Sequence, residues 1–195
     1  MEIILALGLG VTLSAASGFR LFLPLLALSL ATLYSDLELA SAFSWLGTYP
    51  VAIALAIATV VEIIAYCIPV VDNLLDTIEI PVAVTIGTLL TAATLKDVDS
   101  LFLWWGLSIF AGGGTAGIIA TFTALTRLVF TGVTAGTGNF LVAITEALSS
   151  GVLSILALTV LPLGVAIVIG LLIMAIVKLP KFIASWRRRR NNNIL

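Results

Sequence analysis

Residues 51–69 read VAIALAIATVVEIIAYCIP, an apolar run with a single acid near its middle. A helix needs about 20 apolar residues to cross a bilayer, and this run meets that length. Glu62 stands where a charge costs about 2.5–3.5 kcal/mol on insertion scales, so by default it lines a pathway or pairs inside a bundle. The stretch therefore predicts a membrane helix that carries a functional acid.

The whole chain shares this apolar character. Of its 195 residues, 61% are hydrophobic and 10% are charged, whereas soluble domains contain about 25% charged residues. This composition predicts an integral membrane protein. The first apolar segment follows Met1-Glu2 without a basic region, so we expect it to remain in the mature protein rather than to be cleaved as a signal peptide.

Three further runs, 79–95, 139–160 and 163–179, each fit one crossing, the shortest of them if it tilts or meets a thinner bilayer. Segments 3–34 and 101–131 are too long for one upright crossing and too short for two. Both contain clusters of small residues at which a helix can break. Each is therefore expected to be one long tilted helix or a broken, partly re-entrant one.

The order of these segments indicates an internal repeat of residues 1–98 and 99–195. Each half has one long segment followed by two helices, and three crossings per half require the halves to be inverted, as in many transporters. We predict an all-α integral membrane protein with a single transmembrane domain, residues 1–195. It has about six transmembrane segments in two inverted three-helix repeats, with broken or kinked first helices.

Each half also carries one Arg in its first segment and one Glu in its second: Arg20, Glu62, Arg127 and Glu146. Such an Arg can bind an anion, cap carbonyls freed at a break or neutralise a Glu, while a desolvated Glu can carry a proton or bind a cation. These four residues are the predicted substrate or ion pathway near the midplane. Structural Arg–Glu pairing is the alternative, and the sequence does not choose the partner of Glu62.

The distribution of basic residues predicts the orientation. Six of the nine Lys and Arg residues lie in the tail 178–195, so the positive-inside rule places the C-terminus in the cytoplasm, at a bacterial inner membrane. The tail either binds anionic headgroups, at about 1 kcal/mol per residue, or is a topology signal alone. Six crossings put the N-terminus on the cytoplasmic side as well, with the 34–50 loop and the 96–100 linker outside.

Two other groups are candidate sites. Asp72, Asn73 and Asp76 lie between two prolines, with the two acids on one face of any short helix, and form either a cation-binding site or a solvated turn. Backbone N–H groups at a break can hold an anion, and small residues also permit close helix packing. The glycines to which these two uses apply are Gly18, Gly112, Gly113, Gly114, Gly136 and Gly138.

The residue types exclude several kinds of chemistry. The chain has no His and a single Cys, Cys67, so it has no imidazole metal ligands, no thiol–His pair and no internal disulfide. An enzyme would have to use carboxylates alone, and no protease motif surrounds Asp72 or Asp76. We therefore expect no enzymatic activity, no cofactor, no resident metal and no nucleic-acid partner.

Several residues accompany the charges in a recognisable order: Ser17-Gly18-Phe19-Arg20, Glu62 with Tyr66, Pro69, Asp72-Asn73, Leu75-Asp76-Thr77, Pro81, Gly112 to Gly114, Arg127, Thr131 and Gly138-Asn139 with Glu146. Taken together, this set resembles the bacterial multi-pass membrane proteins grouped as domain of unknown function 4126. Phe130 and Phe140 stand where the family pattern has Ser and Pro. The resemblance implies a membrane location over most of the chain and implies no activity.

The sequence thus favours a small transporter or channel for an unidentified solute or ion. A chain of 20.4 kDa has little material to enclose a pathway, so a homo-oligomer in the lipid bilayer is an additional expectation. The alternative is a non-transporting scaffold or lipid-binding protein whose buried charges pair structurally. A wetted cavity at Glu62 and Glu146 would favour transport, and a dry, fully paired cluster would favour the scaffold.

Overall fold

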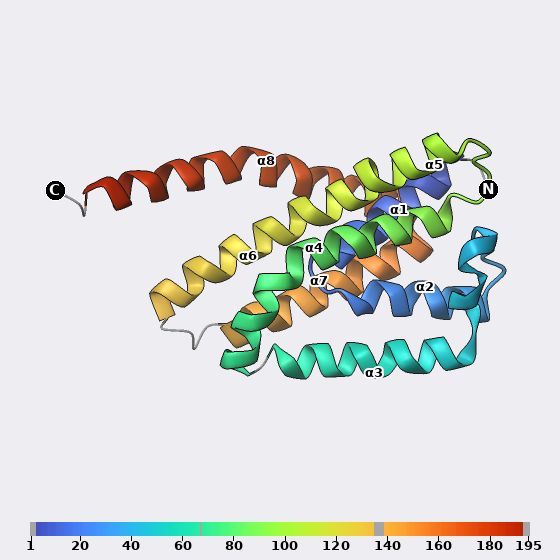
Figure 1. Cartoon of the computed structure of the whole chain (residues 1–195), viewed down its shortest axis with the longest axis horizontal. Helices are drawn as coiled ribbons and strands as arrows, with labels where there is room; N and C mark the ends of the chain where they lie inside the picture. The colour runs from blue at the N-terminus through green and yellow to red at the C-terminus, as the bar shows by residue number, and fades with distance from the viewer. Residues whose placement is uncertain (1–2, 67, 135–138, 193–195) are drawn as a thin grey trace.

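The computed structural model describes residues 3–66, 68–134 and 139–192, with side chains undescribed at 69–70, 72–74, 76–77, 131–134, 139 and 179–192. Every regular element in this part of the chain is helical (Figure 1). The elements are α1 (Ile3–Ser17), α2 (Phe22–Tyr34), η1 (Ser41–Gly47), α3 (Tyr49–Ala65), α4 (Pro69–Thr94), α5 (Leu101–Leu107), η2 (Ser108–Gly113), α6 (Gly114–Thr134), α7 (Asn139–Thr159) and α8 (Leu161–Asn192).

The first long segment is broken, and the chain reverses at the break. Helix α1 runs from one end of the molecule into its middle, and α2 returns to the end from which α1 started (Figure 1). The connection, residues 18–21, therefore lies inside the helix bundle. This is the broken, re-entrant alternative, and it follows the cluster of small residues that predicted a break.

The second long segment stays continuous. Leu101–Phe130 forms one apolar helix of 30 residues, the long tilted alternative. Its glycine run lies at the end of a π-helical turn, η2, where a wider turn replaces the α-helical one. The two long segments therefore have different shapes, although the repeat predicts similar ones.

Among the residues that the structure describes, three helices are long and apolar enough to cross a membrane: Leu101–Phe130, Phe140–Thr159 and Leu161–Lys178. Counting η1 with α3, which are bent by 70°, as one span raises the number to four. Helix α4 begins at Pro69 and keeps Pro81 inside it, so the acidic stretch 69–81 is helical rather than a turn.

The chain begins and ends at opposite ends of the long axis (Figure 1). The start of α1 lies near the 34–50 loop and the 96–100 linker, while α8 runs to the far end. The expected placement of both termini on one side is therefore not found. The physical reason is the reversal between α1 and α2, which turns one predicted crossing into a hairpin that enters and leaves at the same end.

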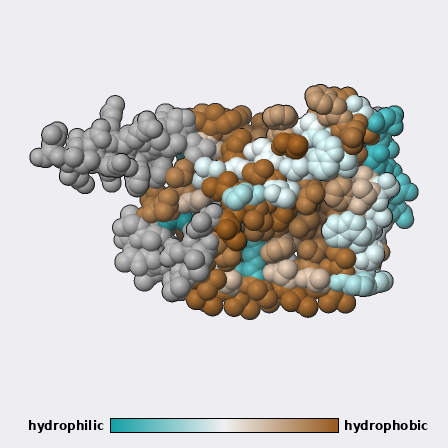
Figure 2. Space-filling view, viewed as in Figure 1, coloured by the Kyte–Doolittle hydropathy of each residue, from teal (hydrophilic) through white to brown (hydrophobic). Residues whose placement is uncertain are grey.

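The surface has the pattern of a membrane protein. Figure 2 shows a broad hydrophobic band around the middle and a hydrophilic cap at the end that holds the 34–50 loop. Tyr and Trp side chains at or near this end are exposed: Tyr34, Trp45, Tyr49 and Trp105. Trp and Tyr gather where a bilayer meets water, so these residues mark the boundary of the apolar band.

Small residues bring α1, α4 and the wide turn η2 into close contact. The Ser14 hydroxyl donates to the Gly87 carbonyl at 2.6 Å and lies 2.9 Å from the Thr91 hydroxyl. A Cβ atom added at Gly112 would stand 2.5 Å from the Gly87 carbonyl oxygen. Because backbones approach this closely only where side chains are small, these residues fix the position of α1, and thereby of the break that follows it.

Candidate functional site: a buried charge cluster at the helix break

The end of α1 receives hydrogen bonds from two other helices. The Ser150 hydroxyl on α7 donates to the Ala16 carbonyl at 2.9 Å, and the Thr123 hydroxyl on α6 lies 3.4 Å from the Gly18 carbonyl. The Arg20 amide also donates to Ala16, at 3.2 Å. Carbonyls freed at a break in an apolar layer need such partners. The break is therefore a built feature that holds Arg20 in place.

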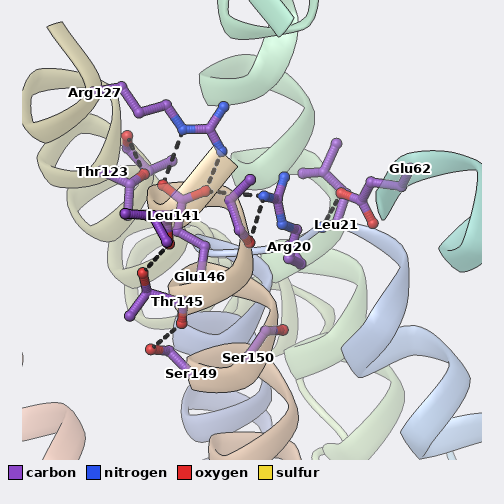
Figure 3. Close-up of polar contacts among 12 residues, drawn as sticks. Arg20, Leu21, Glu62, Thr123, Arg127, Leu141, Thr145, Glu146, Ser149 and Ser150 are labelled. Carbon is purple, nitrogen blue, oxygen red and sulfur yellow. Dashed lines mark hydrogen bonds and ion pairs between the residues drawn. The ribbon is translucent and has the colours of Figure 1, made fainter. Parts of the chain in front are cut away.

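Glu62 caps the start of α2. Its Oε1 accepts a hydrogen bond from the Leu21 amide at 2.7 Å, and its Oε2 accepts one from the Phe22 amide at 3.1 Å (Figure 3). The amides of a first helical turn lack partners within the helix and carry a partial positive charge. The carboxylate from α3 therefore accepts hydrogen bonds from these two amides, and its negative charge is stabilised by the positive end of α2.

Both guanidinium groups bind the other predicted acid, Glu146. Arg20 Nη2 lies 3.1 Å from Glu146 Oε2, and Arg127 Nε donates to Glu146 Oε1 at 3.0 Å. A second bond from Arg127 Nη2 to Oε2 makes that pair bidentate, and Arg20 Nη2 also donates to the Ala143 carbonyl at 2.9 Å (Figure 3). Each Arg thus forms an ion pair with Glu146, whereas Glu62 binds backbone amides.

Tyr66 links the two cations. The Cζ atom of Arg20 lies 3.9 Å from the centre of the Tyr66 ring, and that of Arg127 lies 4.3 Å from it. The electron-rich face of an aromatic ring attracts cations, more strongly where water is excluded. Tyr66 was not among the predicted site residues, although it stands four residues after Glu62 and so shares its helix face.

Glu79 on α4 is a further site residue that the sequence analysis did not select. Its side chain is 2% exposed, and its charge acts on Tyr66. In the sequence it stands at the start of the apolar run 79–95. The signal that points to it is its position seven residues after Asp72 and three after Asp76, which puts all three acids on one helical face.

The cluster is nearly dry. The exposed fraction is 1% for Arg20, 2% for Arg127, 4% for Glu146 and 6% for Glu62. It is not fully paired, because Arg20 Nε and Nη1 are buried without a hydrogen-bond partner among the described residues. A buried donor that stays unsatisfied costs about 1–3 kcal/mol, more when charged, so this face of Arg20 is prepared to accept a partner.

Four of the six predicted glycines lie in the described part of the chain, and three of these are closely packed. A Cβ atom at Gly18 would lie 2.7 Å from the Ala116 carbonyl oxygen, and Gly112 and Gly113 are similarly crowded by α4. Gly114 has nothing within 4 Å. Close packing is thus the visible use of Gly18, Gly112 and Gly113. Gly136 and Gly138, together with the side chains of Asp72, Asn73 and Asp76, lie outside the described residues, so the predicted cation-binding role stays a prediction.

An ion pair at the hydrophilic end is separate from the cluster. The Lys96 ammonium donates to the Glu38 carboxylate and joins the 34–50 loop to the 96–100 linker. This hydrogen bond and the attraction of the charges hold the pKa of Glu38 below its ordinary value of 4.5 and raise the pKa of Lys96 above 10.5. Both groups are exposed, so the pair orders a surface connection and has no direct part in the buried site.

Comparisons with known proteins agree with the resemblance seen in the sequence. The family model described as Domain of unknown function (DUF4126) matches residues 7–181, which contain every member of the charge cluster. No curated protein and no solved structure matches the chain. Within the described residues, no group of three or more His, Cys, Asp or Glu side chains is arranged to hold a metal ion.

Proposed function

The chain belongs to the DUF4126 family, whose description assigns no activity, and we propose from the geometry of its charge cluster that it is a membrane transporter for a small solute or ion. The observation that carries the proposal is the broken α1–α2 pair. It puts the start of α2 and the partly unsatisfied Arg20 inside the apolar band. Transporters use such interrupted helices to present backbone dipoles to a ligand at the midplane.

The arrangement of α3 supports a moving part. This helix packs mainly against α2 and η1, and it exposes apolar side chains over much of its surface. Among its links to the rest of the cluster are Glu62 on the first amides of α2 and the Tyr66 ring, at its end, against the two guanidinium groups. Loss of the Glu62 contact would weaken the hold of α2 on α3, and separation of the two helices would open the cluster toward one face of the membrane.

The directions of the helices and the basic tail support an arrangement of the chain in the membrane. Helices α3 and α7 run in opposite directions, as do α4 and α8, which supports an inverted relation between the later helices of the two halves (Figure 1). The basic tail puts the end of α8 in the cytoplasm of a bacterial inner membrane, beside anionic headgroups. A homo-oligomer supplies the walls that one chain of this size lacks.

A non-transporting scaffold or lipid-binding protein is the second candidate, and the dryness of the cluster favours it. Arg127 and Glu146 form a bidentate pair, and Glu62 is bonded through both oxygens. Under this reading the four residues hold helices together and move nothing.

Flux into liposomes separates the two functions. Purified protein is placed in vesicles with an entrapped pH-sensitive dye, and gradients of sodium, potassium, chloride and acetate are imposed in turn. Transport predicts that at least one gradient changes the internal pH faster than in empty vesicles. The folded variants Arg20→Lys and Glu62→Gln lose about tenfold or more of that rate, because each loses charge-assisted hydrogen bonds of the site.

Glu38→Gln is the matched control, because this exposed acid lies outside the cluster. It should keep the full rate. Wild-type protein that gives no flux above empty vesicles, or folded cluster variants that keep the full rate, would favour the scaffold.

A further inference from the structure

The carboxylate of Glu62 occupies a site that is built to bind a carboxylate. Two successive backbone amides at the start of α2 hold its two oxygens, at 2.7 and 3.1 Å. This two-pronged arrangement fits a planar carboxylate, and the positive end of α2 adds to the attraction. The occupant is a side chain of the protein itself, so the site is filled by a tethered anion.

A second, independent feature of this site is Arg20. Its side chain is 1% exposed, and Nε and Nη1 have no hydrogen-bond partner among the described residues. Figure 3 shows Arg20 standing between Glu146 and Glu62, with only its Nη2 atom bonded to the Glu146 side. A buried guanidinium with idle donors beside a helix N-terminus is the combination that recognises a carboxylate.

We infer that the amides of Leu21 and Phe22, with Arg20, form the binding site of a small monocarboxylate that displaces Glu62 and enters together with one proton. This inference rests on the proposed transport function and names its substrate class. The ligand carboxylate takes the two amide hydrogen bonds, and the proton neutralises the displaced Glu62. One negative charge and one positive charge enter together, so the net charge of the cluster does not change.

The surrounding charges require the proton. Among the described residues, the cations that act on Glu62 are Arg20 and Arg127, and both of them pair with Glu146. Tyr66 lies in the field of both Glu62 and Glu79. Glu62, Glu146 and Glu79 are three acids, so the acids of the cluster already outnumber its two cations. A second free carboxylate would add uncompensated charge in a region without water, which is costly. Protonation of Glu62 removes that cost.

The site is small, because it is filled by the end of one glutamate side chain. Glu62 can leave this site by a movement of α3, since that helix packs mainly against α2 and η1. Once its carboxyl group is neutral, Glu62 loses its strong attraction to the helix end and α3 can carry it away. The proton and the monocarboxylate therefore bind and leave as a pair.

Calorimetry with sodium acetate tests this on the full chain in detergent. Acetate should bind the wild type with uptake of about one proton, measured in buffers of different ionisation enthalpy. Its affinity should fall roughly tenfold per pH unit where Glu62 is ionised in the free protein, because binding is linked to that proton. Glu62→Gln should bind acetate roughly tenfold more tightly, without proton uptake or pH dependence, because the tethered anion is gone.

Arg20→Lys should weaken acetate binding by about tenfold, and Glu38→Gln should bind as the wild type does. Infrared difference spectra provide a readout that does not depend on the stability of any variant. Acetate should produce a new carboxylic acid carbonyl band in the wild type that Glu62→Gln lacks. Chloride and phosphate serve as competing probes.

The inference is overturned if acetate does not bind, if binding takes up no proton, or if chloride or phosphate binds in its place. It is also overturned if Glu62→Gln leaves both affinity and proton uptake unchanged. Flux of another ion without acetate binding would leave the proposed transporter standing with a different substrate. Acetate that binds with a proton but is not moved across liposomes would keep the site and refute transport.

Discussion

At the scale of single residues, the two predicted acids have different roles despite their matching positions in the sequence. Glu146 forms ion pairs with two guanidinium groups, whereas Glu62 binds the backbone of α2. Both Arg residues pair with Glu146 because the helices beside the break and α6 all pack against α7. Sequence position carries no information about this choice, since it depends on how three separate segments meet.

The difference predicts unequal costs of mutation. Glu146→Gln should lower the free energy of unfolding by about 3–5 kcal/mol, because it removes a carboxylate that pairs with both Arg20 and Arg127 in a dry site. Glu62→Gln should cost only roughly 1–2 kcal/mol, since the amide oxygen can still accept one backbone hydrogen bond. Chemical denaturation in detergent measures both values. Equal costs would show that the two acids share one structural role.

The exposed Glu38–Lys96 pair gives a pH-dependent prediction. The pKa of Glu38 lies below 4.5 in the folded protein, so its contribution is complete above that value and is lost as pH falls through the folded pKa. Lys96 behaves in the opposite sense: its pKa is raised, so its contribution is present below 10.5 and disappears as pH rises past the folded pKa. Melting temperatures of the wild type and Glu38→Gln should converge as pH falls from about 6 to about 3. A difference that is constant over this range would mean that the pair contributes nothing.

At the scale of the helices, the glycine run provides a matched pair of substitutions. Gly112→Ala should destabilise the fold by about 1–3 kcal/mol, because its Cβ would stand 2.5 Å from the Gly87 carbonyl oxygen and 2.7 Å from Thr91 Cβ. Gly114→Ala meets nothing within 4 Å and should be neutral or stabilising by up to about 1 kcal/mol. Thermal unfolding of both variants checks the difference. A tolerated Gly112→Ala would contradict the close contact between η2 and α4.

Most helices could be predicted from apolar length alone. The run 139–160 became α7, and 163–179 lies inside α8, because an uninterrupted apolar stretch has no other stable form in a bilayer. The run 79–95 was predicted too short. Helix α4 extends back to Pro69 because Pro is tolerated at a helix start. The acids in its first turns lower the hydropathy there, so apolar length alone puts the start of the helix too late.

Breaks were harder to predict than helices. Small residues marked both long segments, yet the first reverses direction and the second continues through a π-helical turn. The outcome depends on what surrounds the small residues. Around Gly18 the freed carbonyls find Thr123 and Ser150, whereas around Gly112 the backbone packs on α4. The position of Arg20 in the site was predictable from its charge, but the capping of α2 by Glu62 was not.

At the scale of the whole molecule, the reversal of α1 and α2 decides the membrane topology. With the C-terminal tail in the cytoplasm, the start of α1 and the 34–50 loop should both face outward. Single cysteines at Ile4 and Leu39, in a Cys67→Ala background, should react with a membrane-impermeant maleimide added outside intact cells. A cysteine in the tail should react only after the membrane is opened. Protection of the Ile4 position would restore the model of six full crossings with both termini inside.

The contacts at the break also determine when this part of the protein can complete its folding during synthesis. The Ala143 carbonyl that binds Arg20 is encoded 123 residues after it, and the Ser150 hydroxyl that binds Ala16 is 134 residues further along the chain. At about 5–20 residues per second, a ribosome needs roughly 6–27 s to make that interval. During this period the first hairpin lacks the Glu146 carboxylate and the side-chain donors that α6 and α7 later supply to its carbonyls. The N-terminal part of the protein is therefore made first and completed last, and a nascent chain stopped before α7 should be a target for membrane proteases.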